Sequence, residues 1–65
     1  MSDTDKIKNI LKSHIELMEK QRKGVAELLD ELNDASAKIS ARTILARFDA
    51  EIILSQTDLN KLKPK

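Results

Sequence analysis

Few side chains in this sequence could do chemistry, and their spacing matches no catalytic pattern. His14 is the only histidine, and the chain has no cysteine and no glycine-rich phosphate loop. No serine has an obvious base beside it. Carboxylates such as Glu16 and Glu19 lie at helical spacing from Lys20 and Lys23, which is typical of solvated ion pairs on a polar helix face. We therefore expect a protein that is not an enzyme and has neither cofactor nor metal site.

The composition favours an all-α protein. At 65 residues the chain is one domain at most and lies near the lower size limit for a stable core. Strands favour β-branched and aromatic residues and need turn residues between them. Here Phe48 is the only aromatic residue, Gly24 the only glycine and Pro64 the only proline. Without disulfides, burial must stabilise the fold, and we expect a second chain to contribute to it.

Charge and hydropathy argue against two classes of partner. The 12 basic and 11 acidic side chains are interspersed, which argues against binding a polyanion by charge alone. The longest apolar run, Ile52–Leu54, is too short to cross a bilayer. The acidic N-terminus lacks the features of a signal peptide. We expect a soluble cytoplasmic protein with no membrane partner.

A first helix is predicted over residues 3–33. Its heptad positions step by four and three along Ile7, Leu11, His14, Met18, Gln21, Val25, Leu28 and Leu32. At about 100° per residue the apolar side chains fill an arc about 160° wide. These side chains are Ile7, Ile10, Leu11, Ile15, Leu17, Met18, Val25, Leu28, Leu29 and Leu32. Charged residues occupy the other side.

A second helix is predicted over about residues 36–62. Continuing the first register would place Arg42 and Asp49 on the seam, so the pattern indicates a break, for which Asn33 and Asp34 supply turn-forming side chains. A new seam follows at Ala41, Leu45, Phe48, Ile52, Ser55, Leu59 and Leu62. The start could lie anywhere from residue 35 to 41. Near the predicted end, Lys61 and Lys63 should complement the helix dipole and Pro64 should stop the helix, leaving a short polar tail. An antiparallel helical hairpin is favoured over one long coiled-coil rod.

A second apolar stripe runs along the predicted second helix, roughly opposite its seam. We call Ile39, Ala46, Ala50 and Ile53 the outer stripe; with Thr57 they cluster within about 60°. The outer stripe is the predicted partner-binding surface, although alanines can also serve as helix formers on an exposed face. Two hairpins could dimerise into a four-helix bundle, or one could clamp a helix of another protein. We favour the homodimer.

His14 and Gln21 fall within the apolar arc of the first helix, seven residues apart. A polar side chain in such a seam usually fixes the register of the helices, so we expect a buried polar layer. Exposure at a groove filled by a partner, and a pH-sensitive role of His14, are the alternatives.

An RNA-binding role is the alternative function. It would use a basic cluster of Lys20, Arg22, Lys23, Lys38, Arg42 and Arg47. Glu19, Glu27 and Asp49 interrupt this cluster, and no aromatic side chain is placed to stack on bases. A solvated face of mixed charge is therefore the preferred interpretation, with nucleic acid as an unlikely partner.

In size and layout the expected hairpin resembles the Rop family of plasmid RNA-binding regulators, in which hairpins dimerise into a four-helix bundle. It also resembles the small helical co-chaperones of bacterial secretion needles. Both resemblances concern the fold alone, so no residue roles are carried over. The sequence thus predicts a small interaction module, such as a regulator, an adaptor or a chaperone-like protein, that acts through an apolar helical surface.

Overall fold

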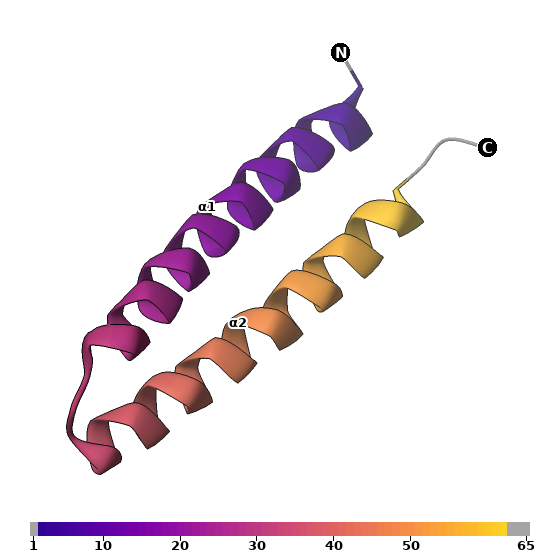
Figure 1. The fold of residues 1–65 in the computed structure, drawn as a ribbon. Helices are drawn as coiled ribbons and strands as arrows, with labels where there is room; N and C mark the ends of the chain where they lie inside the picture. Colours follow the sequence, from indigo (N-terminus) through magenta and orange to yellow (C-terminus); the bar gives the residue numbers. More distant parts are fainter. Residues whose placement is uncertain (1, 63–65) are drawn as a thin grey trace.

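The computed structural model describes residues 2–62 and is an antiparallel helical hairpin (Figure 1). Helix α1 spans Asp3–Glu31 and helix α2 spans Ala35–Lys61, so the start of α1 and the end of α2 lie at the same end. The all-α hairpin is confirmed, and the helix bounds agree with the predicted ones to within two residues. The predicted roles of Lys63 and Pro64 and the polar tail lie outside the described residues.

Each helix begins at a capping side chain. The Ser2 hydroxyl accepts a hydrogen bond from the backbone N–H of Asp5 at 3.1 Å, and the Asp34 carboxylate accepts one from the N–H of Ala37 at 2.9 Å. Such caps satisfy N–H groups that have no partner within the helix. Because Asp34 is the cap of α2, the second helix begins at the earliest position of the range predicted for it.

The two helices pack along a heptad seam. On α2 the seam is the predicted one, Ala41, Leu45, Phe48, Ile52, Ser55, Leu59 and Leu62, all buried or half-buried. On α1 it consists of Lys8, Leu11, Ile15, Met18, Arg22, Val25, Leu29 and Leu32, again buried or half-buried. The core is thin: among the described residues only Ile15, Met18 and Ala41 are buried apolar residues, with 7%, 5% and 4% of their surface exposed.

The predicted seam of α1 was wrong at every second position. Lys8, Ile15, Arg22 and Leu29 take the places that the heptad pattern had assigned to Ile7, His14, Gln21 and Leu28, which are exposed. Each of the four predicted residues lies one position before the residue that occupies the seam, which is a rotation of about 100° around the helix. An apolar arc about 160° wide exceeds what one neighbouring helix covers, so α1 buries one edge of its arc and leaves the other open.

In the part of the chain that the structure describes, one ion pair joins the two helices. The Arg22 guanidinium donates to a carboxylate oxygen of Asp49 at 2.5 Å. The two side chains are 41% and 51% exposed, so the pair contributes at most about 1 kcal/mol to stability. It helps to align the helices, but the apolar seam carries the fold.

Candidate interaction surface

The open edge of the α1 arc forms a second heptad line beside the seam. We call it the α1 groove line: Ile7, Ile10, His14, Leu17, Gln21, Gly24 and Leu28, all exposed. Its members are spaced by alternating steps of three and four, and each directly precedes a seam residue. Residues with this spacing share one side of a helix. The α1 groove line therefore runs the length of α1, turned about 100° from the seam.

Helix α2 has a matching line on the same side of the hairpin. The α2 groove line is Ser40, Ile44, Arg47, Glu51, Leu54, Asp58 and Lys61, all exposed. Two shallow hollows show that the two lines lie on one face. The first, of about 370 Å³, is lined by His14, Met18, Gln21, Ile44, Arg47, Phe48 and Glu51. The second, of about 450 Å³, is lined by Ile7, Ile10, Leu11, Asp58, Lys61 and Leu62. We call this side of the hairpin the groove face.

Most of the exposed large aliphatic side chains lie on the groove face. Eight large aliphatic side chains in the described part of the chain are exposed. Six of them belong to the two groove lines: Ile7, Ile10, Leu17, Leu28, Ile44 and Leu54. Their exposed fractions run from 41% at Ile44 to 70% at Ile10. Single exposed aliphatic residues need no explanation, but a row of them along a groove marks an interaction surface.

The outer stripe lies where the sequence placed it, on the side of α2 away from the seam. Ile39 and Ile53 are each 62% exposed, and Ala46 and Ala50 between them are exposed as well. The hydroxyls of Thr43 and Thr57 donate to the carbonyls of Ile39 and Ile53, at 3.0 and 2.9 Å, so these donors are already satisfied. The four residues lie together on one side of α2, but neither of the two hollows borders them, and the outer stripe has fewer large side chains than the groove face. That a partner binds there stays a prediction.

The expected polar layer is absent from the core of the hairpin. His14 and Gln21 are both exposed and line the first hollow, beside Met18 and Phe48 at its floor. The reason is the rotation of α1, which places Ile15 and Arg22 in the seam instead. His14 and Gln21 are the polar members of an open groove, which was the alternative interpretation of the two residues.

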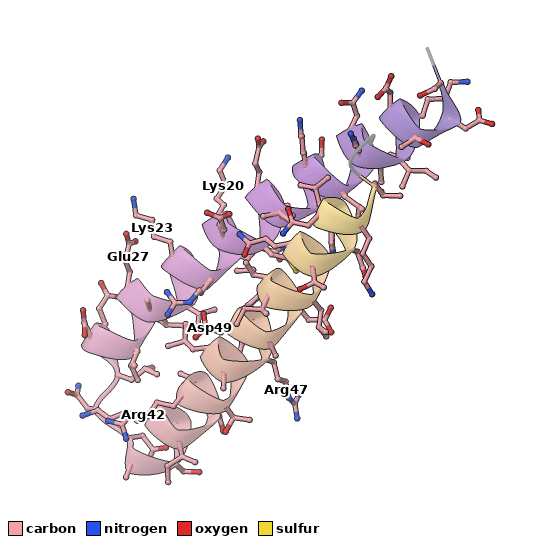
Figure 2. All side chains as sticks on the ribbon, turned by 90° about the vertical axis from the view of Figure 1, so that its right-hand side faces the viewer. Lys20, Lys23, Glu27, Arg42, Arg47 and Asp49 are labelled. Carbon is pink, nitrogen blue, oxygen red and sulfur yellow. The ribbon has the colours of Figure 1, made fainter. Side chains whose placement is uncertain are left out.

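The basic residues proposed as nucleic-acid contacts do not form one patch. Figure 2 shows Lys20 and Lys23 extending from α1 away from α2, whereas Arg47 extends from α2 away from α1. Arg47 lines the first hollow, and Arg22 is paired with Asp49. Lys38 is half-buried near the start of α2, and Arg42 is exposed one turn further on. The hairpin therefore spreads these charges over several sides.

The fold and the surface together define a helical hairpin with one open apolar groove. Within residues 2–62, no cluster of three or more acidic or histidine side chains is arranged to hold a metal ion. Neither of the two described helices is long and apolar enough to cross a membrane. Comparisons with protein-family models, with curated proteins and with solved structures gave no match to this chain. The groove face itself is thus the evidence on which a function can be argued.

Proposed function

We propose that the protein is a non-catalytic protein-interaction module, of the regulator, adaptor or chaperone-like kind, that acts through its groove face. The observation that supports this is the row of six exposed aliphatic side chains along the two groove lines. A fully buried Leu or Ile side chain stabilises by about 1.5–3 kcal/mol, so each of these half-exposed side chains has on the order of 1 kcal/mol still to contribute. A partner that covers the face gains this stabilisation.

The shape of the groove favours a helical partner. Two parallel ridges of side chains with a shallow trough between them accept a helix, because side chains of the incoming helix pack into the spaces between them. The partner is a protein, either a second copy of this chain or a different one. An RNA-binding role is not proposed, because the basic residues point to different sides. The cytoplasmic location stays a prediction.

A matched pair of substitutions tests the groove face against the outer stripe. Leu17→Glu places a charge in the middle of the groove face, and Ile53→Glu places the same charge on the outer stripe. Leu17 and Ile53 are 52% and 62% exposed, and Glu is a good helix former, so both variants keep the hairpin. Circular dichroism checks the helix content. Association is measured by sedimentation of the purified chain and by affinity capture of bound proteins from an extract of the source cells.

The expected result is that the wild-type chain and Ile53→Glu form the same complex and that Leu17→Glu does not. Burying an unpaired carboxylate in an apolar contact is strongly unfavourable, so the loss should be complete. If Ile53→Glu loses the complex and Leu17→Glu keeps it, the outer stripe is the binding surface. If both variants behave like the wild type, the proposed function is wrong.

A further inference from the structure

We infer that the groove face is covered by a second copy of this chain. The two copies are related by a two-fold axis that runs across the groove face, perpendicular to the helices, at the first hollow. This inference rests on the proposed function of the groove face and names its partner. In this arrangement α1 packs antiparallel against α1 of the second copy, and α2 packs against α2. Antiparallel helices match residues at equal distances on either side of the axis, so the sequence of each groove line can be compared with its own reverse.

The α1 groove line matches its own reverse. With the centre next to Leu17, that residue meets Leu17 of the second copy. Ile7 then lies opposite Leu28, and His14 lies opposite Gln21. The larger side chain of Ile10 faces the open position at Gly24, where an added Cβ atom would meet nothing within 4 Å in the single hairpin. Apolar residues thus meet apolar residues, and the imidazole meets an amide that can share a hydrogen bond with it.

Six of the seven residues of the α2 groove line pair with one another in reverse order, and the central charges are complementary; Ser40 lies opposite Asp58, and Lys61 has no counterpart in the line. With the centre at Asp49, Ile44 lies opposite Leu54 and Arg47 lies opposite Glu51. The two-fold axis repeats each of these contacts, so two Arg–Glu pairs form across the interface. Oppositely charged side chains at the edge of an apolar contact fix the register of the helices.

The two centres coincide in space. The first hollow is lined by His14 and Gln21, which flank the centre of the α1 line, and by Arg47 and Glu51, which flank the centre of the α2 line. One axis through this hollow therefore serves both lines at once. The centre of each groove line depends only on the sequence of its own helix, and the packing of the hairpin brings the two centres to the same height.

The other two-fold arrangement brings unlike residues together. An axis parallel to the helices would place α1 against α2 of the second copy at the same height along the hairpin. Residues at the same height share a hollow, so Ile7 and Ile10 would face Asp58 and Lys61. Burying those charges against aliphatic side chains is costly. The perpendicular axis avoids this contact.

The size of the face is adequate for a dimer. The Cα atoms of the hairpin extend over 49 × 15 × 12 Å. A face of 49 by 15 Å covers about 740 Å² before side chains widen it, which is close to the roughly 800 Å² per partner of a stable protein interface. A second copy can therefore cover the whole groove face.

A charge-inversion experiment tests the register. Arg47→Glu produces a chain with two acidic residues at these positions, and Glu51→Arg produces a chain with two basic ones. Each variant alone meets like charges twice across the two-fold axis, so we expect self-association at least about tenfold weaker than that of the wild type. An equimolar mixture pairs each acidic chain with a basic one and should recover affinity to within a few-fold of the wild type. Sedimentation equilibrium with one chain labelled measures the self-association of each variant and the association of the two variants in the mixture. A mixture as weak as its components would overturn the inference.

A cysteine variant tests the axis without changing charge. The natural chain has no cysteine, so Leu17→Cys introduces a single thiol next to the proposed axis. Mild oxidation should link most of the chains into dimers through residue 17. The matched variant Ile53→Cys, which lies on the outer stripe, should remain largely unlinked. Equal linking of both variants, or none at residue 17, would contradict the two-fold contact.

Failure of this inference is distinguishable from failure of the proposed function. If the wild-type chain sediments as a monomer at all accessible concentrations, the second copy is not the occupant. The groove face would still be the binding site if an identified host protein is captured by the wild type and by Ile53→Glu but not by Leu17→Glu. If that comparison also shows no difference, both proposals are wrong.

Discussion

Replacing Gly24 with alanine should stabilise the hairpin. Gly24 lies in the interior of α1, its backbone does not adopt a positive φ, and a Cβ atom built there meets nothing within 4 Å. The added methyl group therefore causes no clash, while the glycine's extra backbone freedom in the unfolded chain is removed. In a helix interior the difference between glycine and alanine is about 1 kcal/mol. For a chain of this size, that raises the melting temperature by about 4–8 °C.

Thermal unfolding followed by circular dichroism at 222 nm measures this shift, at a low and a high protein concentration to separate folding from self-association. Ala50→Gly is the matched control, because Ala50 is also exposed in a helix interior and makes the reverse change. It should lower the melting temperature by a similar amount. A lower melting temperature for Gly24→Ala at the low concentration would refute the reasoning. It would mean that the space beside Gly24 is needed for a close contact, or that its backbone departs from the helical conformation.

Two further substitutions probe the elements that hold the hairpin together. Asp34→Ala removes the side chain that caps α2 and should cost about 1 kcal/mol, whereas Asp34→Asn, which can still accept the hydrogen bond from Ala37, should cost much less in urea denaturation. Met18→Ala deletes most of a side chain that is only 5% exposed in the seam and should cost about 2–3 kcal/mol, against less than about 0.5 kcal/mol for Ile39→Ala, where the side chain is 62% exposed. Equal losses for Met18→Ala and Ile39→Ala would show that the seam is not the core.

The seam of α2 could be predicted from the sequence because charged residues adjoin its centre. Arg47 and Asp49 flank Phe48, and Glu51 directly precedes Ile52, so this part of the apolar line stands out. The start of α2 could not be fixed, since Asp34, Ser36 and Ser40 all offer capping side chains within a few residues, and only the geometry of the turn selects Asp34. Capping energies differ too little between such side chains for the sequence to decide.

The seam of α1 could not be predicted because two apolar lines lie side by side on one helix. Ile7, Ile10, Leu17 and Leu28 belong to one line, while Ile15, Met18 and Leu29 belong to the other. A regular heptad drawn through both takes alternate members from each, as the predicted seam did. The signal that separates them is that each groove residue immediately precedes a seam residue, but which of the two lines faces α2 depends on packing. The α2 groove line was missed because only two of its seven members are large aliphatic residues.

The offset between the lines is itself an argument for a four-helix assembly. On both helices the groove line lies one residue before the seam, which is a rotation of about 100°. A helix in a four-helix bundle has two neighbours at roughly a right angle to each other, so it needs two contact lines separated by about this angle. A hairpin alone supplies only one neighbour.

The two groove lines have different roles in the proposed dimer. Helix α1 contributes apolar burial through its isoleucines and leucines, and α2 selects the register through Arg47 and Glu51. A partner that offered only an apolar helix would satisfy the first line and leave the charges of the second unpaired, which is why a second copy fits the groove face better than a generic apolar helix.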